Sequence, residues 1–284
     1  MDKNKQQTFS TGLYLVSTPI GNMEDITYRA LRALKNSDII LCEDTRRSGK
    51  LLSYFQIKSK LLPYHKFNEK KVTFKIIDAL KKQKIISLVS DAGTPTISDP
   101  GIILINKCVE ENLPVYPIPG TSAVTSAISI SGFSDQYLFF GFLSKNKNEL
   151  NKILKKLCNL NYSIVFFIPA TKLNYYISKF KEYFFDRKIM IAKEMTKIHE
   201  EFIRKEVNLI NELPENFKGE LTVVLSEKIK EKNIKKEVSE SVKMEIEKML
   251  KKYSHKDVVE FISKKENLPK KIVYNFCLKL KKIK

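Results

Sequence analysis

Short apolar runs, often β-branched, alternate with segments of helical periodicity through the first half of the chain. Strands are predicted at residues 13–16, 39–42, 60–64, 85–89 and 115–118. Helices are predicted between them, at about 28–34, 50–55, 69–82 and 102–112. Such alternation predicts right-handed βαβ crossovers and a mostly parallel sheet covered on both faces, which is an α/β fold.

The pattern changes after Gly120. A helix of small residues is predicted over 122–131, and further helices at about 149–157 and 172–183. Strand candidates follow at 136–142, 163–168, 188–193, 200–204 and 221–225. Several of these strands succeed one another without a helix between them, so they predict a mixed or antiparallel sheet in a second, α+β domain.

A nearly all-charged segment, 227–237, is predicted to be a linker. Basic helices are expected beyond it, at about 238–252, 257–265 and 270–282. Two short helices around the break at 267–269 are typical of a helix-turn-helix, although a small packing appendage would have the same pattern. The predicted division is therefore an N-terminal α/β domain (1–119), a second domain that completes a cleft (120–228), and a linker with a basic helical tail (229–284).

Polar loops follow several of the predicted strands. They read STPIGN at 17–22, EDTRR at 43–47, SDAGT at 90–94 and PIPGTSA at 117–123. In a parallel sheet, ligands bind beyond the carboxyl ends of the strands. Asp91 can accept hydrogen bonds there, and Gly93 lets the backbone approach a ligand without a Cβ. A turn that caps the next helix would explain one such loop, but two on successive strands favour a small-molecule site.

Charge and cysteine usage narrow the class of protein. The chain has 51 Lys and Arg against 32 Asp and Glu, a net charge of +19. This excess favours a phosphate-bearing partner such as RNA, or an acidic membrane surface. Because the excess is spread along the whole chain, genome-wide compositional drift would also produce it. The four cysteines lie far apart without a CxxC pair, which predicts free thiols and no metal site. No apolar run approaches the ~20 residues of a bilayer span and no secretory signal is present, so a cytoplasmic location is expected.

Taken together, the motifs resemble the ribosomal RNA small subunit methyltransferase I family, cytidine 2′-O-methyltransferases of the tetrapyrrole methylase superfamily. The matching stretches are LYLVSTPIGNMEDITYRAL (13–31), EDTRRSGKLL (43–52), LVSDAGTPTISDPG (88–101), PIPGTSAVTSA (117–127) and AKEMTK (192–197), besides the basic tail. The resemblance implies a two-domain fold that binds S-adenosylmethionine between its domains. It also implies 2′-O-methylation of a decoding-centre cytidine in 16S rRNA of the small ribosomal subunit, usually by a homodimer.

The resemblance also implies site residues. Those expected at the cofactor are Pro19, Asp91, Ala92, Gly93, Thr94, Thr121, Ser122, Ala123, Ile168, Ala192 and Leu221. Those expected at the RNA, all after the ends of the first three strands, are Asn22, Asp25, Arg46, Arg47 and His65. Asp44 is the first hypothesis for a general base on the ribose hydroxyl, and Glu43 is the second. The alternatives are a local salt bridge between Asp44 and Arg46 and, for His65, a solvated loop histidine.

Two other functions stay open. A tetrapyrrole or corrin methylase of the same superfamily would need the cleft, but not the EDTR loop or the basic tail. A non-catalytic RNA-binding protein would explain departures from the family pattern after residue 168 and after residue 220. A dinucleotide-binding dehydrogenase is disfavoured, because no GxGxxG follows the first strand. Methyl transfer from a sulfonium is an in-line displacement, so positioning should supply most of its rate.

Overall fold

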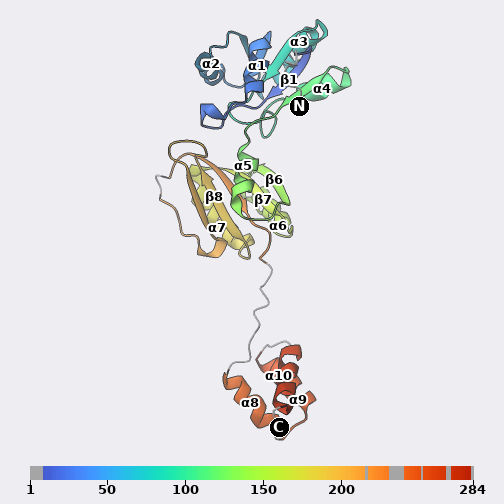
Figure 1. The fold of residues 1–284 in the computed structure, drawn as a ribbon, viewed down its shortest axis with the longest axis vertical. Helices are drawn as coiled ribbons and strands as arrows, with labels where there is room; N and C mark the ends of the chain where they lie inside the picture. Colours follow the sequence, from blue (N-terminus) through green and yellow to red (C-terminus); the bar gives the residue numbers. More distant parts are fainter. Residues whose placement is uncertain (1–8, 215–216, 230–239, 251, 267–269, 283–284) are drawn as a thin grey trace, which may run out of the picture. The chain divides into compact units, whose positions relative to one another are not determined.

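The computed structural model describes residues 9–214, 217–229, 240–250, 252–266 and 270–282. Contacts between residues divide the chain into two compact units, Met1–Lys228 and Ile229–Lys284. The first unit contains two five-stranded sheets, and the second is helical (Figure 1).

The first sheet is entirely parallel. Its strands, in chain order, are β1 (Gly12–Val16), β2 (Ile39–Cys42), β3 (Lys60–Pro63), β4 (Ile85–Leu88) and β5 (Val115–Ile118). In space they lie side by side in the order β3-β2-β4-β1-β5. The helices between them are α1 (Tyr28–Asn36), α2 (Thr45–Tyr54), α3 (Glu69–Lys81) and α4 (Ile102–Glu110). The predicted α/β alternation and parallel sheet are therefore confirmed.

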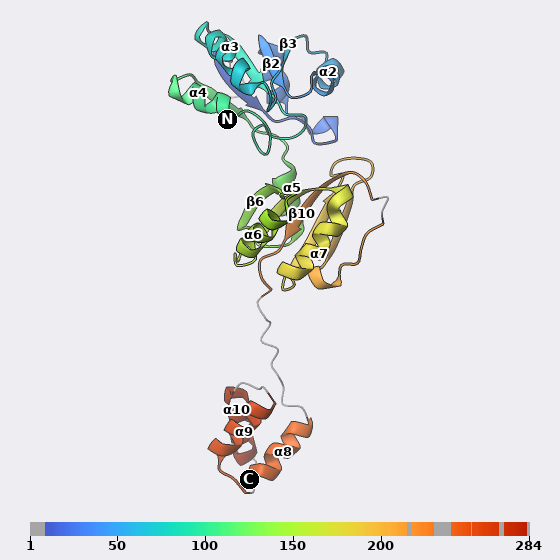
Figure 2. The same cartoon turned by 180° about the vertical axis from the view of Figure 1, so that it is seen from behind.

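Both faces of this sheet are covered, because successive side chains of a strand point to opposite faces. In β1, Tyr14 packs in a cluster with Leu34 of α1 and Leu52 of α2. The preceding residue, Leu13, packs in a different cluster with Ile76 of α3 and residues of α4. Figure 2 shows α3 and α4 on one side of the sheet, with α2 on the other. The strand ends and their loops are thereby left free at one edge.

Side-chain caps set where the helices of this edge begin. The hydroxyl of Thr27 accepts a hydrogen bond from the N–H of Ala30, so α1 begins at Tyr28. The carboxylate of Asp44 accepts one from the N–H of Arg46, so α2 begins at Thr45. The predicted start near Lys50 was wrong, because apolar periodicity is missing from the capped first turn.

The second sheet is mixed, as predicted. Its strands, in chain order, are β6 (Tyr137–Phe142), β7 (Ser163–Pro169), β8 (Lys188–Lys193), β9 (Glu201–Glu206) and β10 (Glu220–Leu225). In space they lie side by side in the order β6-β7-β10-β8-β9. Only the β6–β7 pairing is parallel. The helices α6 (Lys147–Leu157) and α7 (Leu173–Tyr183) pack on one face, and α5 (Ala123–Ser131) packs on the other. Short 3-10 helices lie at η1 (Met23–Asp25), η2 (Ala170–Lys172) and η3 (Val207–Leu209).

The second unit consists of α8 (Glu240–Leu250), α9 (His255–Lys265) and α10 (Lys270–Lys282) around a small apolar core. Ser254 caps α9 by accepting from the N–H of Asp257, and its hydroxyl donates to the Asp257 carboxylate at 2.6 Å. The break at 267–269 and most of the predicted linker lie outside the described residues. Within the described part of the chain, no helix has both the length and the apolar composition needed to cross a membrane.

The boundary between the first two predicted domains falls between β5 and α5. Residues on both sides of it belong to one compact unit by their contacts. The predicted division into domains at residues 119 and 228 therefore stays a prediction, beside the two units Met1–Lys228 and Ile229–Lys284.

Candidate functional site

A cavity of about 460 Å³ lies where the loops at the carboxyl edge of the first sheet face the second sheet. We call it the main cavity. The loops after β1, β2 and β4 contribute Ile20, Glu43, Asp91 and Asp99, among others, and the strands of the second sheet contribute the opposite wall. The complete lining is Ile20, Glu43, Arg47, Asp91, Ala92, Gly93, Thr94, Ile97, Ser98, Asp99, Ser122, Ala123, Val124, Phe142, Phe167, Ile168, Pro169, Gly219, Glu220, Leu221 and Thr222.

The loop after β4 is held by its own backbone. Gly93 donates its N–H to the carbonyl of Thr18 at 3.0 Å and accepts from the Thr18 N–H at 2.9 Å. This pair of bonds joins the loop after β1 to the loop after β4. The φ of Gly93 is 77°, and a Cβ there would lie 3.3 Å from Ile20 Cγ2. Glycine is therefore required both by conformation and by the close approach of the two loops.

Hydroxyl groups connect the loop after β5 to the same assembly. Thr94 donates its hydroxyl hydrogen to the carbonyl of Thr121 at 3.0 Å, and its Oγ1 lies 3.0 Å from the Ser17 hydroxyl. The hydroxyl of Thr121 in turn donates to the carbonyl of Thr18. Thr121 thus lies behind the cavity wall and fixes the loops that form it.

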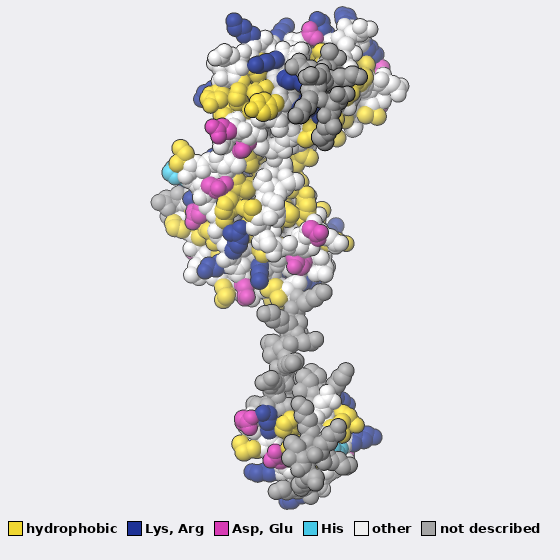
Figure 3. All heavy atoms as spheres, in the orientation of Figure 1, with side chains coloured by type: hydrophobic (Ala, Val, Ile, Leu, Met, Phe, Trp, Pro, Cys, Tyr) yellow, Lys and Arg dark blue, Asp and Glu magenta, His cyan; other side chains and the backbone are white. Residues whose placement is uncertain are grey.

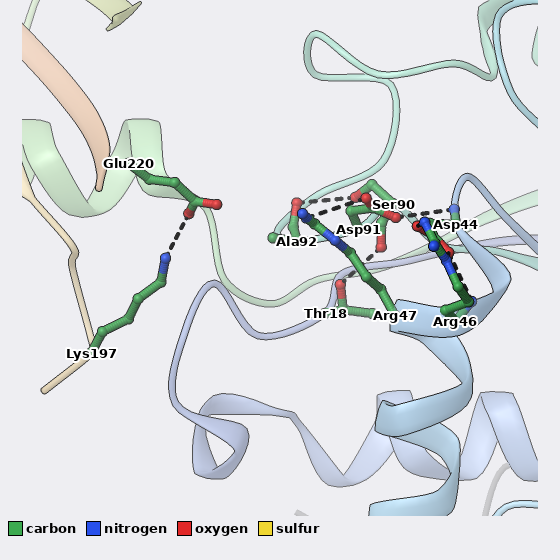
Figure 4. A network of polar contacts seen from close by, with 9 residues as sticks. All are labelled: Thr18, Asp44, Arg46, Arg47, Ser90, Asp91, Ala92, Lys197 and Glu220. Carbon is green, nitrogen blue, oxygen red and sulfur yellow. Dashed lines mark hydrogen bonds and ion pairs between the residues drawn. The ribbon is translucent and has the colours of Figure 1, made fainter. Parts of the chain in front are cut away.

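Two ion pairs lie at the ends of β2 and β4 (Figure 4). Asp91 accepts from the backbone N–H of Asp44 at 3.1 Å and lies 3.3 Å from the Arg47 guanidinium. Asp44 is bound by Arg46 through two hydrogen bonds, of 3.1 and 2.7 Å. The Arg46 side chain holds the pKa of Asp44 well below its usual range. The local salt bridge considered as the alternative for this pair is therefore formed.

Asp99 is a site residue that sequence reasoning missed. Burial raises its pKa to about 6, and the negative charges of Glu43 and Asp91 contribute to the rise. Among the described residues, no basic side chain forms an ion pair with Asp99 or Glu43. Asp99 belongs to an Asp-Pro-Gly sequence, which by itself indicates only a turn.

The opposite wall of the main cavity is apolar. Phe142, Phe167, Ile168 and Leu221 of the second sheet line it, and the rings of Phe142 and Phe167 lie 5.5 Å apart. Their planes are tilted by 59°. The main cavity therefore presents carboxylates on one side and a surface suited to a flat aromatic ring on the other.

Most residues predicted at the cofactor line the main cavity: Asp91, Ala92, Gly93, Thr94, Ser122, Ala123, Ile168 and Leu221. Pro19 lines a neighbouring cavity of about 230 Å³, which we call the middle cavity. Ala192 is fully buried and pairs with Thr222 in the β8–β10 ladder, outside the lining. It packs instead in the cluster between α5 and the second sheet.

The residues predicted to contact RNA are less closely grouped. Arg47 lines both the main and the middle cavities, and Asn22 lines an open groove of about 770 Å³, which we call the outer groove. The side chain of Arg46 is 87% exposed. Asp25 lies in η1 and His65 lies after β3, and neither borders these three hollows.

The comparisons with known proteins agree with this fold. The profile of the family described as tetrapyrrole (corrin/porphyrin) methylases matches residues 12–210. "Ribosomal RNA small subunit methyltransferase I" of Thermotoga maritima is 46% identical over 219 residues, which cover 76% of this chain and 98% of the relative. The protein of the same name from Buchnera aphidicola is 37% identical over 275 residues, covering 94% of this chain and 96% of the relative. Among solved structures, the methyltransferase CobJ superposes with a TM-score of 0.59 at 15% identity, covering 77% of this chain and 95% of CobJ.

Proposed function

The chain belongs to the tetrapyrrole (corrin/porphyrin) methylase family, and from this premise we propose that it is an S-adenosylmethionine-dependent methyltransferase of small-subunit ribosomal RNA. The observation that carries the proposal is the main cavity, formed by the family-like loops at the carboxyl edge of the first sheet. The finer proposal, from the resemblance of the motifs, is 2′-O-methylation of a decoding-centre cytidine in 16S rRNA.

The main cavity fits the proposed cofactor in size and chemistry. Its volume of about 460 Å³ is in the range of small-molecule sites. S-adenosylmethionine carries an ammonium and a sulfonium, which suit the carboxylates of Asp91 and Asp99. Its own carboxylate suits Arg47, whose planar guanidinium can bind two oxygens. Its adenine ring suits the apolar wall that includes Phe142 and Phe167.

When bound, S-adenosylmethionine supplies an electrophilic methyl group. The protein must hold an acceptor hydroxyl in line with that group and keep water out, and positioning of this kind supplies a large part of the rate. The fixed loops around Gly93 and Thr94 provide a rigid wall for this purpose.

Methyl transfer to a hydroxyl requires a group that accepts the proton of that hydroxyl, and carboxylates line the main cavity. Asp44 is a poor base, because Arg46 binds both of its oxygens and lowers its pKa. Glu43 and Asp99 line the main cavity without an ion-pair partner among the described residues, and the raised pKa of Asp99 suits proton acceptance near neutral pH. We therefore assign proton acceptance to Glu43 and Asp99 in preference to Asp44.

The test of this assignment compares Glu43→Gln with Asp44→Asn. Glu43→Gln is expected to lower kcat by at least about tenfold, because positioned acid–base catalysis commonly contributes 10²–10⁴-fold. Asp44→Asn should keep most of the turnover, since asparagine also caps helices. The assignment is wrong if Asp44→Asn loses activity while Glu43→Gln keeps it, with both variants folded.

The test of the function itself is transfer of labelled methyl from S-adenosylmethionine to small ribosomal subunits that lack the modification. Label on one cytidine ribose, lost in Asp91→Ala, is the expected result. Label on tetrapyrroles alone would favour the tetrapyrrole methylase alternative. If the protein binds neither S-adenosylmethionine nor S-adenosylhomocysteine, the result would favour a non-catalytic RNA-binding protein.

A homodimeric state, a cytoplasmic location and the domain boundary at residue 119 are further parts of the proposal. The first is drawn from the resemblance and the other two from the sequence. Sedimentation velocity at micromolar concentration distinguishes a dimer from a monomer of 32.9 kDa.

A further inference from the structure

The main cavity is the first of three adjoining hollows in the first unit. It shares Ile20, Arg47, Asp91, Ala92 and Glu220 with the middle cavity. The middle cavity shares Gly21, Met23 and Lys197 with the outer groove. Shared lining residues mean that the three hollows adjoin one another in this order, and we call the series the track.

The middle cavity is lined by basic side chains from α2 and from the segment after β8. Lys197, from the AKEMTK stretch after β8, is held at 3.1 Å by Glu194 and at 2.9 Å by Glu220. Arg47, on α2, is paired with Asp91 (Figure 4). Lys50, one turn further along α2, lines the same cavity and has no ion pair in the described part of the chain. Lys50 is therefore the uncompensated cation of the track.

The outer groove adds an exposed aromatic ring. Tyr54 lines it and is 63% exposed, beside the amide of Asn22 and the imidazole of His199. Arg47, Lys50 and Tyr54 are three and four residues apart on α2, so they lie along one face of the helix. One helix thus presents a guanidinium, an ammonium and an aromatic ring in sequence from the main cavity outward.

We propose that the RNA strand carrying the acceptor ribose runs along this track, with a phosphate on Lys50 and a flanking base against Tyr54. The inference rests on the proposed function and deepens it. Sequence-specific RNA recognition commonly uses unpaired nucleotides whose bases stack on aromatic side chains. Proteins that bind single-stranded nucleic acid combine cations with exposed aromatic rings on which bases stack, and Lys50 and Tyr54 are such a combination. The main cavity then holds the methyl donor, and the middle cavity holds the acceptor nucleotide.

The experiment measures binding of labelled small ribosomal subunits by filter retention across a series of salt concentrations, for Lys50→Gln and Tyr54→Ala. Lys50→Gln should weaken binding and reduce the slope of log Kd against log salt by ~0.7, the value for one phosphate contact with a single strand. Tyr54→Ala should weaken binding at least about fivefold at unchanged slope, as expected for loss of one stacked base.

Matched controls come from two other helices that pack on the first sheet. Lys35→Gln on α1 removes an exposed lysine, and Phe74→Ala on α3 removes an aromatic ring that is 67% exposed. Both should leave subunit binding unchanged. All four variants should bind S-adenosylhomocysteine as the wild type does and show the same Tm. This result excludes misfolding as the cause of weaker subunit binding.

The proposal is overturned if Lys50→Gln and Tyr54→Ala bind subunits as tightly as their controls, with an unchanged salt slope. It is also overturned if they lose S-adenosylhomocysteine affinity to the same extent as subunit affinity. Binding is measured without methyl transfer, so a wild type that binds subunits through Lys50 and Tyr54 but transfers no methyl would reject the proposed function and keep the track.

Discussion

The carboxylates in and next to the main cavity have similar chemistry but different partners. Asp44 is half-buried and bound by Arg46, outside the lining of the main cavity, and Asp91 is paired with Arg47. Asp99 is partly buried and faces other negative charges, which raise its pKa to about 6 after the larger effect of burial. Strongly perturbed pKa values are common at functional sites, so the raised pKa of Asp99 supports a role for this residue in the chemistry of the main cavity.

Asp99→Asn is expected to stabilise the protein and impair it as a catalyst. Burial raises the folded-state pKa above the unfolded value of 3.8, so ionisation of Asp99 lowers stability as pH rises from about 4 to about 6, and the loss stays constant at higher pH. At pH 7.5 the substitution should raise the free energy of unfolding by ~1–3 kcal/mol, and at pH 4 by much less. Urea unfolding at both pH values checks this.

The activity of the same variant provides the second readout. Wild-type turnover should fall as pH drops through about 6, because Asp99 then becomes protonated, and Asp99→Asn should be slow at every pH. An equal gain in stability at pH 4 and 7.5 would contradict the role of its ionisation.

Arg187 is a buried cation that acts on structure. Its guanidinium donates to the carbonyls of Cys158, Leu160, Tyr162 and Ser226, which joins the segment after α6 to the end of β10. Arg187→Met would leave these carbonyls without their donor, so we expect a loss of ~3 kcal/mol or more in unfolding free energy. Chemical denaturation measures it, with Arg204→Met as a control for an exposed arginine. A loss below 1 kcal/mol would contradict this account.

At the scale of elements, the loop after β4 and the helix α2 organise the site. The loop after β4 depends on Gly93, whose φ of 77° and contact with Ile20 exclude a side chain. Helix α2 carries Arg47, Lys50 and Tyr54 along one face. The first element shapes the main cavity, and the second leads out of it.

Gly93→Ala is expected to weaken S-adenosylhomocysteine binding by at least about tenfold and to lower stability by ~1–2 kcal/mol. Gly132→Ala is the matched control, because Gly132 has a similar φ of 72° and no atom within 4 Å of the added Cβ. It should lose comparable stability but keep full affinity in isothermal titration calorimetry. Equal affinity losses in both variants would mean that the loop geometry at Gly93 is not specific to the cofactor.

At the scale of the whole molecule, positive charge is spread rather than concentrated. On the face drawn in Figure 3, Lys and Arg side chains are dispersed over each unit. The Thermotoga maritima relative aligns over 98% of its own length but only 76% of this chain. A substantial part of this chain therefore has no counterpart in a relative named as a methyltransferase.

Truncation after Lys228 should accordingly leave S-adenosylhomocysteine affinity unchanged, because the main cavity lies wholly within the first unit. If the basic helices of the second unit contact RNA, subunit binding should weaken and its salt dependence should become shallower. Titrations of the full chain and residues 1–228 test both statements. A truncated protein that no longer binds S-adenosylhomocysteine would show that the second unit supports the site.

Local sequence patterns predicted most of the elements, the parallel first sheet, the mixed second sheet and the loops that line the main cavity. These follow from local features, since apolar periodicity and strand-end Gly, Pro and Asp residues act within a few positions of the chain. Asp91 and Gly93 could be identified in this way, and Thr94 through the resemblance of the motifs.

The partners and the burial of the site side chains could not be predicted from the sequence, because they depend on tertiary packing. Asp44 is engaged by Arg46, Ala192 is buried behind the wall, and Asp99 is perturbed by burial beside Glu43. Lys50 and Lys197 meet in one cavity although 147 positions separate them. Burial, charge pairing and shared walls depend on residues that are distant in sequence, and they exist only once the sheets have packed.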